Sequence, residues 1–352
     1  MPPASSVGSV WRPNVRRTNT DTRAPHVPLA DATGIRAALR ALGFAPEVPR
    51  PVLVMVGGAG SMSEESVGTV RALSHDVIFP VVAGMGGVVV GGGTGDGVPG
   101  IAGEYGQSGE HRLALGTVAR GTILPPDGSG RPEAWPAPLG PGYSAFISCP
   151  GDRWGDEIGL MNRAADAITH GNAAYAMGSA TLLANGGPVS MHDVEAAIGA
   201  GRPVIALGGT GRLADWIGAT QRATENRAAA GDARLFAEMG DNRERVAVMS
   251  SQVRWIEPGD VSGLRDALTT ALLTVRSQAP PDRAAERLRE KSPVSFRHDA
   301  VSKGLGPSPA SVAPAAHVVR NTATARGPSQ TSTRVAGESS EGPEAKGLHL
   351  FR

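Results

Sequence analysis

The chain has 352 residues, enough for one large domain or two small ones. Its formal net charge of +1 gives no strong field to attract nucleic acid or an anionic membrane, and its single cysteine, Cys149, excludes an intramolecular disulfide and a cysteine-rich metal site. Abundant glycine and proline, with only 4% aromatic residues, favour a loop-rich α/β protein over a β-sandwich.

The two ends of the chain differ from its middle in composition. Residues 1–30 are polar and lack the apolar segment of a signal peptide, so they predict a flexible arm. Residues 277–352 are rich in Pro, Ser, Thr and Ala without periodicity, and they predict a disordered tail. The longest apolar stretch, Val77–Val90, is too short to span a bilayer. We therefore expect a cytoplasmic protein, folded at residues 31–276, that contacts neither membrane nor nucleic acid.

The middle of the chain alternates short apolar runs with helical patterns. Helices are predicted at Asp31–Leu42, from Ser63, at Gly97–Tyr105, at Asp156–Thr169, from Ser190 through Ile198, from Leu213, and at Val261–Val275. Strands are predicted at Pro51–Val56, Val88–Val90, Leu113–Ala119, Tyr143–Ser148, Ala180–Ala184 and Pro203–Leu207, with a last one at Val246–Met249 or Val253–Ile256. Ser190 and Asp193 have the spacing of a helix capping box. The alternation predicts an α/β fold, a Rossmann-like parallel sheet with helices on both faces.

Four predicted strands end in glycine turns, at Gly57–Gly60, Gly91–Gly97, Gly186–Gly187 and Gly208–Gly211. Because the carboxyl ends of parallel strands lie along one edge of a sheet, we expect these turns to meet there. Glycine allows a close approach of the backbone, and the helix N-termini that follow favour phosphate. The turns therefore predict a nucleotide site. For each turn taken alone, the alternative is that glycine only relieves backbone crowding.

The expected ligand-binding residues follow from these turns. They are Gly57, Gly58 and Gly60; Gly92, Gly93, Thr94 and Gly97 for one phosphate; Gly186, Gly187, Pro188 and Ser190 for a second position; and Gly209, Thr210, Gly211 and Arg212 for a third. We expect Arg212 to contact a phosphate and Asp215 to accept ribose hydroxyls, unless the two form a surface ion pair. Glu104 either holds the main glycine loop through its N–H groups or is a solvated helix residue.

The motifs also resemble a known family. Gly92-Gly93-Thr94-x-x-Gly97-Val98, with Gly103-Glu104 following, resembles the G-G-T-x-x-G-V…G-E block of SLOG domains in melastatin-type TRP channels, here in its prokaryotic form. Leu183-x-x-Gly186-Gly187-Pro188-x-Ser190 and the segment Pro203–Asp215 resemble the second and third glycine motifs of that family, and Gly155-x-Glu157 fits the segment between. The motifs follow the family order over roughly residues 50–275.

This resemblance implies a sensor that binds a nucleotide or a nucleotide-derived messenger of the ADP-ribose type. It implies no metal and no required cofactor beyond the ligand. Homodimers are common in the superfamily, and the chain shows no effector motif of its own. The resemblance therefore leaves room for a homodimer and for a separate effector protein.

An enzyme is the first alternative. The superfamily includes phosphoribohydrolases of the lysine-decarboxylase-like (LOG) type, whose P-G-G-x-G-T-x-x-E motif supplies a catalytic glutamate and follows an Arg-Lys pair. Asp193 stands at the position of that glutamate, but no Arg-Lys pair occurs near Thr169–Asn172. Hydrolysis of a nucleotide N-glycosidic bond would need Asp193 or Glu195 as the carboxylate, and no other catalytic residue is predicted.

Two further alternatives remain open. Gly95-x-Gly97-x-x-Gly100, with Arg120 about 20 residues later, is a loose match to an NADP-binding fingerprint. The domain could also be an interaction module that has lost its ligand. In that case Gly93→Asp would leave every activity intact.

Overall fold

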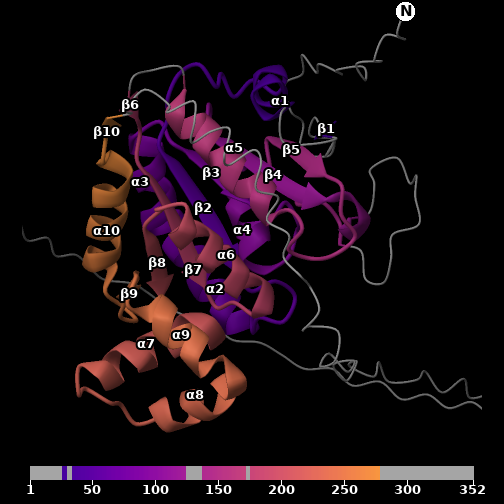
Figure 1. The fold of residues 1–352 in the computed structure, drawn as a ribbon. Helices are drawn as coiled ribbons and strands as arrows, with labels where there is room; N and C mark the ends of the chain where they lie inside the picture. Colours follow the sequence, from indigo (N-terminus) through magenta and orange to yellow (C-terminus); the bar gives the residue numbers. More distant parts are fainter. Residues whose placement is uncertain (1–25, 30–33, 124–136, 172–174, 278–352) are drawn as a thin grey trace, which may run out of the picture. The chain divides into compact units, whose positions relative to one another are not determined.

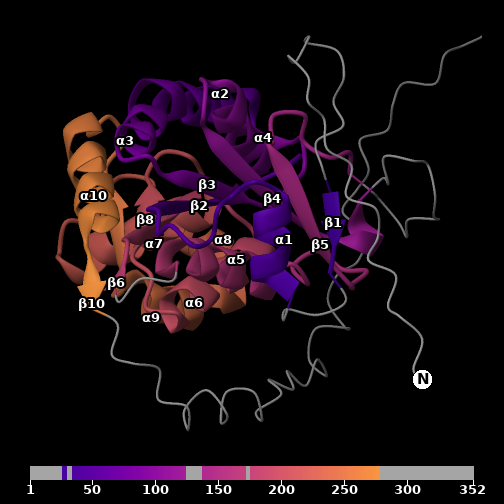
Figure 2. The same cartoon turned by 90° about the horizontal axis from the view of Figure 1, so that it is seen from above.

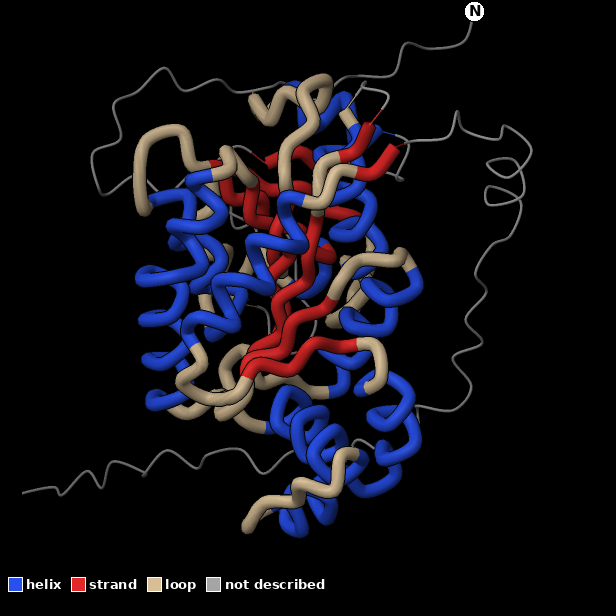
Figure 3. Tube along the Cα trace, turned by 90° about the vertical axis from the view of Figure 1, so that its left-hand side faces the viewer, coloured by secondary structure: helices blue, strands red, loops and turns tan. Residues whose placement is uncertain are grey.

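Eight strands form one parallel sheet in the computed structural model (Figures 1 and 3). They are β1 (His26–Pro28), β2 (Val52–Gly57), β3 (Val88–Gly91), β4 (Leu113–Ala119), β5 (Ala145–Cys149), β7 (Ser179–Ala184), β8 (Val204–Leu207) and β9 (Val253–Ile256). Their order across the sheet is β1-β5-β4-β3-β2-β7-β8-β9, and all neighbouring pairs are parallel. The predicted α/β fold with a parallel sheet is confirmed.

The structure describes residues 26–29, 34–123, 137–171 and 175–277, which belong to one compact unit at Met1–Glu290. Most of the predicted arm at residues 1–30 and all of the predicted tail after residue 277 lie outside these ranges. The described end of the arm forms β1, which pairs with β5 through His26 and Phe146. The sheet therefore begins inside the segment that composition alone assigns to a flexible arm.

Helices cover both faces of the sheet (Figure 2). On one face lie α2 (Glu64–Leu73), a π-helical turn (Ser74–Ile78), α3 (Phe79–Gly84), α4 (Gly97–Glu104) and α10 (Val261–Leu273). On the other lie α1 (Ile35–Ala41), α5 (Ile158–His170), α6 (Pro188–Gly199), α7 (Arg212–Thr224) and α9 (Arg243–Ser250), with α8 (Asp232–Met239) packed against α7. A separate antiparallel pair is formed by β6 (Tyr175–Ala176) and β10 (Arg276–Ser277).

The core follows the alternation of side chains along the strands. In β2, Val52, Val54 and Val56 pack into the layer of α1, α5, α6 and α7, while Leu53 and Met55 pack into the opposite layer. All five side chains are buried, as expected for a central strand of a parallel sheet. The two hydrophobic clusters hold the helices against the sheet, and these helices follow the loops at the carboxyl edge.

Several elements differ from those predicted. The stretch Val77–Val90 contains a helix, α3, before β3, because Pro80 stands in the first turn, where its missing N–H is not needed. Of the two candidates for the last strand, Val253–Ile256 is the strand and Val246–Met249 lies in α9. The helix predicted from Ser190 begins earlier, at Pro188, with Gly187 as its N-cap. The predicted capping box is therefore wrong, because Ser190 and Asp193 both lie inside the helix.

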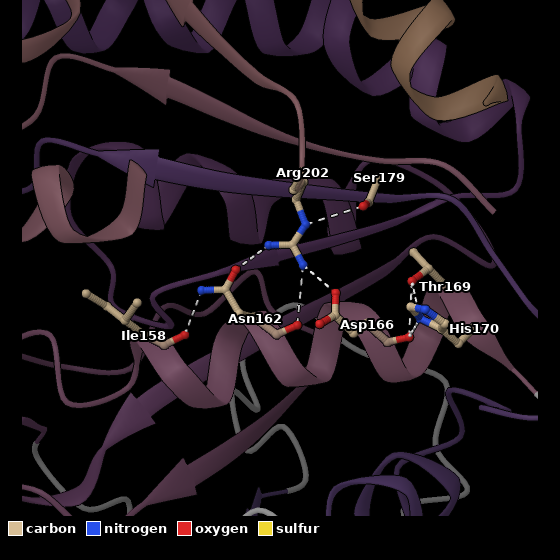
Figure 4. A network of polar contacts seen from close by, with 7 residues as sticks. All are labelled: Ile158, Asn162, Asp166, Thr169, His170, Ser179 and Arg202. Carbon is tan, nitrogen blue, oxygen red and sulfur yellow. Dashed lines mark hydrogen bonds and ion pairs between the residues drawn. The ribbon is translucent and has the colours of Figure 1, made fainter. Parts of the chain in front are cut away.

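At the amino edge of the sheet, a buried arginine connects two strands and a helix (Figure 4). Arg202 precedes β8, and its guanidinium donates to Ser179 of β7 at 3.3 Å. It also donates to Asn162 and, at 2.7 Å, to the Asp166 carboxylate, both on α5. The Arg202 side chain is 1% exposed, so these bonds satisfy a charge that is removed from water. Across the described ranges, no helix combines the length and the apolar content needed to cross a membrane.

Candidate functional site

A cavity of about 600 Å³ opens at the carboxyl ends of β2, β3 and β7. Strands β2 and β7 are paired neighbours, although β3, β4 and β5 come between them in the sequence. The strand order therefore reverses at this point, which is where parallel α/β sheets bind ligands. The cavity wall is formed by residues from the segments 55–61, 92–99, 137–138, 154–161 and 187–193, and by Arg212.

The turn after β2 presents unpaired backbone N–H groups to the cavity. Gly57 has a φ of 152°, and a Cβ there would lie 1.9 Å from the Ala184 carbonyl oxygen, so only glycine allows β2 to end against β7. Within the described residues, the N–H groups of Ala59, Gly60 and Ser61 have no acceptor. Open N–H groups in a glycine turn bind anions. The predicted Gly57, Gly58 and Gly60 all line the cavity.

The turn after β3 divides into residues that line the cavity and residues that shape it. Gly92 and Thr94 are in the wall. Gly93, at φ 72°, has its N–H on the Tyr143 hydroxyl at 3.3 Å, and Gly97 lies so close to the first turn that a Cβ would be 2.3 Å from the Gly58 carbonyl oxygen. Gly93 and Gly97 are therefore packing glycines here and are outside the wall.

Asp96 is a wall residue that sequence reasoning missed. It precedes α4 as the N-cap residue, yet its carboxylate makes no capping hydrogen bond and lines the cavity. A Cβ added to Gly60 would lie 4.0 Å from Asp96 Oδ2, which places this carboxylate across from the open N–H groups of the first turn. The sequence did contain a signal for Asp96, because a polar residue between a glycine turn and a helix often lies at a binding site.

The turn after β7 continues the wall into α6. Gly187, Pro188 and Ser190 line the cavity, whereas Gly186, at φ 105°, does not and packs against Ser190 and Leu183. Gly187 and Pro188 stand at the N-terminus of α6, whose dipole favours an anion. These three residues bring part of the predicted second position to the cavity wall, and their contact with a ligand stays a prediction.

The turn after β8 is held by hydrogen bonds within the protein and does not line the cavity. Gly209, Thr210 and Gly211 are absent from the wall. The Thr210 hydroxyl donates to Leu207 O and accepts from Asn185 N–H, both at 2.7 Å. The Asp215 carboxylate accepts from the N–H groups of Gly209 and Gly211 at 2.6 and 3.0 Å. Asp215 was expected to accept ribose hydroxyls, but its two oxygens already bind this turn and it does not line the cavity.

Arg212 brings a positive charge to the cavity. Its guanidinium donates to the Ser61 hydroxyl at 3.1 Å and lies against Gly187, where a Cβ would be 3.1 Å from Nη2. No carboxylate among the described residues forms an ion pair with Arg212, which excludes the alternative of an Arg212–Asp215 surface pair. The backbone of Arg212 has a φ of 50°, a conformation that arginine rarely adopts. Arg212 therefore joins the turn after β2 to the turn after β7, beside the open N–H groups.

Two buried carboxyl groups lie in another part of the wall. Glu157 precedes α5 and accepts the Gly155 N–H at 3.0 Å, and Asp193 extends from α6. Burial raises the pKa of Glu157 to about 7. Burial, and next the nearby Glu157, raise the pKa of Asp193 well above its usual range. Asp193 was predicted as a carboxylate of the alternative enzyme, while Glu157 had no assigned role, although the Gly155-x-Glu157 motif marked its position.

Trp154 adds an aromatic surface to the wall. Its side chain is 44% exposed, and it lines the cavity together with Met161. An exposed aromatic ring at a cavity wall can stack on a flat ligand group such as a base. Position in sequence gave little signal for this, because exposure depends on the turn at Gly155, whose φ is 103°.

Three predicted residues lie elsewhere. The Glu104 carboxylate contacts Arg71 Nε at 2.9 Å and His75 Nε2 at 2.8 Å, so it joins α4 to α2 and the π-helical turn and does not hold the glycine loop. Glu195 forms a bidentate pair with Arg245 and is outside the wall, because it projects from another side of α6 than Asp193. The Arg120 guanidinium donates to the Leu29 carbonyl and is also outside the wall.

Residues 50–253 match the profile of the family described as "SLOG in TRPM, prokaryote". Among solved structures, a molybdenum cofactor carrier protein from Chlamydomonas reinhardtii is similar over 64% of this chain and 99% of its own, with 14% identity and a TM-score of 0.36. The protein TM1055 is similar over 62% of this chain and 99% of its own, with 19% identity and a TM-score of 0.39. Among curated proteins, no significant match was found.

Proposed function

Because the chain belongs to the prokaryotic SLOG-in-TRPM family, we propose that its carboxyl-edge cavity binds a nucleotide or nucleotide-derived ligand of the ADP-ribose type. One observation carries the proposal. The Arg212 guanidinium, without a carboxylate partner among the described residues, contacts Ser61 beside the open N–H groups of Ala59 and Gly60.

The composition of the wall supports an anionic ligand on that side. A guanidinium and backbone N–H groups donate charge-assisted hydrogen bonds to phosphate, each contributing on the order of 1.5–3 kcal/mol. The N-terminus of α6 at Pro188 adds a favourable dipole. Together a few such contacts give micromolar affinity, on the order of 8 kcal/mol. The cavity volume of about 600 Å³ lies in the range typical of small-molecule sites.

As a sensor, the protein would report ligand binding to a partner. We propose that this partner is a second copy of the chain or a separate effector protein. Binding of the ligand requires no further cofactor in this proposal. The cytoplasm, where nucleotide messengers are made, is the compartment that fits this role.

The experiment that tests binding is thermal unfolding of the full chain with AMP, ADP, ADP-ribose, NAD, NADP and cyclic dinucleotides. A ligand at 100 times its Kd stabilises the fold by about 2.7 kcal/mol, which raises the Tm by a few degrees for a protein of this size. Arg212→Asn is the informative variant, because asparagine tolerates the φ of 50° and removes the charge. It should abolish the shift.

The matched control is Arg234→Asn, since Arg234 is an exposed arginine that pairs only with Glu238 on α8. This control should retain the full Tm shift. A shift that survives in Arg212→Asn would refute the assignment of the anion side. The absence of any shift with every compound would refute the proposed ligand class. A response confined to NADP would favour the dinucleotide alternative.

A second candidate is hydrolysis of a nucleotide N-glycosidic bond. The buried pair Glu157 and Asp193 favours it, because burial raises the pKa of both carboxyl groups, and a carboxyl group with a raised pKa can serve as a general acid. Glu195 is unsuited to this role, because it is engaged by Arg245 outside the cavity. Chromatography of each incubated sample distinguishes hydrolysis from binding, because it separates the intact ligand from the free base. Free base that disappears in Asp193→Asn would support hydrolysis, and an intact ligand would support binding alone.

A further inference from the structure

The Asp193 carboxyl group is buried and has no partner among the described residues. Its residue is 8% exposed, it lines the cavity, and no hydrogen bond or ion pair from the described residues reaches its carboxyl oxygens. Buried polar groups in folded proteins are nearly always hydrogen-bonded, and leaving one unpaired is costly. The Asp193 oxygens are not among the fully enclosed unpaired atoms, so they are open to the cavity and available to a donor on a ligand.

Glu157 is a second buried carboxyl group in the same part of the cavity wall. It is 9% exposed and lines the same cavity. The Gly155 N–H donates to Oε2 at 3.0 Å, and the backbone N–H of Glu157 itself also interacts with this carboxyl group. Neither carboxyl has an arginine, lysine or histidine ion-pair partner in the described part of the chain. Both carboxyl groups are therefore able to accept hydrogen bonds from a ligand.

The kind of donor follows from the charges around it. A phosphate is repelled by these two carboxyl groups and is better placed at Arg212, where the single wall carboxylate, Asp96, is accompanied by a guanidinium and open N–H groups. The described residues contain no group of three His, Cys, Asp or Glu side chains that could hold a metal ion. Hydroxyl groups both donate and accept hydrogen bonds, so they suit carboxyl groups in either protonation state. A vicinal diol provides two such groups side by side.

The position of Asp193 suits the diol of a nucleotide. Asp193 lies five residues beyond Pro188, the first residue of α6, which corresponds to about 7.5 Å along the helix axis. A phosphate at the helix N-terminus beside Arg212 and a hydroxyl at Asp193 are then one phosphoribosyl unit apart. Acidic side chains also bind ribose hydroxyls in other dinucleotide folds.

We propose that Glu157 and Asp193 form a subsite for the ribose 2′- and 3′-hydroxyls, so that the cavity selects ribonucleotides over deoxyribonucleotides. This inference rests on the proposed function, because it assigns one part of the same ligand. It gives the cavity two chemically distinct sides, an anion side at Arg212 and a diol side at the carboxyl pair. Asp215, expected from the sequence to bind the ribose, has no part in it.

The test is calorimetric titration of the full chain with ADP, 2′-deoxy-ADP, 3′-deoxy-ADP and inorganic pyrophosphate. Loss of a hydroxyl that binds a buried carboxyl weakens binding by about tenfold to a hundredfold. ADP is therefore expected to bind at least ten times more tightly than both deoxy compounds. Asp193→Asn and Glu157→Gln should remove most of this preference and leave pyrophosphate affinity within twofold.

Glu195→Gln is the matched control, because Glu195 lies on the same helix outside the cavity and pairs with Arg245. It should keep the full preference for ADP. Equal affinities for ADP and the deoxy compounds would overturn the diol subsite while the proposed function stands. If neither ADP nor pyrophosphate binds, the anion side fails, and the proposed function and the subsite fall together.

Discussion

The Asp215 carboxylate accepts a hydrogen bond from the Gly209 N–H at 2.6 Å, and this contact determines the shape of the turn before α7. A second bond, from Gly211 at 3.0 Å, completes the turn directly before Arg212. Arg212 reaches the cavity only because its backbone is held at a φ of 50°. The position of the cationic side chain therefore depends on a carboxylate that does not touch the cavity.

Replacing Asp215 by alanine tests this dependence. The variant removes the acceptor of two N–H groups. Water can replace it at Gly209, which is exposed, whereas an unpaired donor at the half-buried Gly211 costs about 1–3 kcal/mol. We expect a loss of about 2 kcal/mol in the free energy of unfolding, measured in urea, and a weaker affinity for pyrophosphate. Asp266→Ala is the control, because Asp266 is exposed on α10. Unchanged pyrophosphate affinity in Asp215→Ala would show that the turn does not position Arg212.

The raised pKa of Glu157 predicts how stability depends on pH. Its pKa is about 7 in the folded protein against 4.5 ordinarily, so between these values the folded state keeps a proton that the unfolded state has released. The contribution of Glu157 to stability therefore falls as the pH rises from about 4.5 to about 7. Glu157→Gln removes this loss and keeps an acceptor for Gly155.

Urea unfolding at two pH values checks this prediction. At pH 8 we expect Glu157→Gln to be more stable than the natural chain by up to about 3 kcal/mol, and at pH 4.5 we expect a difference close to zero. Glu195→Gln should show no such pH-dependent gain. A destabilised Gln variant at pH 8 would mean that the Glu157 carboxylate is stabilised by a partner.

The buried guanidinium at the amino edge of the sheet predicts an asymmetric mutational response. Arg202→Ala removes the donors that join α5 to β7, and breaking such a buried pair costs about 3–5 kcal/mol. Asp166→Asn should cost less, about 1–2 kcal/mol, because the buried guanidinium loses its carboxylate but the asparagine oxygen can still accept its hydrogen bond. Urea midpoints of the two variants provide the comparison. Equal losses would indicate that the Asp166 charge, and not the burial of Arg202, dominates.

The two glycine turns nearest the cavity should respond differently to alanine. At Gly93 a Cβ would lie 2.5 Å from Val118 and the φ is 72°, so Gly93→Ala, and equally Gly93→Asp, should destabilise the fold. Gly93→Asp is therefore unsuited to test for an empty pocket. At Gly60 a Cβ meets only Asp96 at 4.0 Å, and no left-handed φ is required.

Gly60→Asp is the suitable substitution. It places a negative charge beside the open N–H groups and should abolish the Tm shift by ADP while leaving the Tm of the free protein within about two degrees. Gly60→Ala should retain the shift. If Gly60→Asp responds to ADP like the natural chain, no phosphate lies at the first turn.

The sequence was a good guide to the sheet and a weaker one to the wall of the site. Apolar runs such as Val52–Val56 and the glycines after them predict both the strands and their common edge, because burial on both faces leaves a continuous pattern. The helix predicted from Ser63 had no predicted end. In the structure it continues through the π-helical turn at Ser74–Ile78 into Phe79–Gly84, which a short apolar segment does not reveal.

Within the site, side-chain chemistry could be predicted but contacts could not. Gly57, Gly58, Gly60, Gly92 and Gly187 line the cavity, whereas Gly93, Gly97 and Gly211 pack loops against one another. Nothing in the sequence separates these two uses of glycine, because both require a missing side chain. The roles of aspartates are equally hard to predict from the sequence, since Asp215 and Asp193 differ only in their surroundings in the folded protein.

The pairing of β2 with β7 also affects how the protein folds. Matching Gly57 to Ala184 closes the longest loop between any neighbouring strands of the sheet, so the entropic penalty for this pair is the largest. The helices and the pairs β3–β4 and β7–β8 can form from nearer parts of the chain before it. The cavity is complete only when β2 and β7 have paired. During refolding, ligand binding should therefore recover later than helix content. The amount of bound ligand should then measure the fraction of chains that have reached the native state.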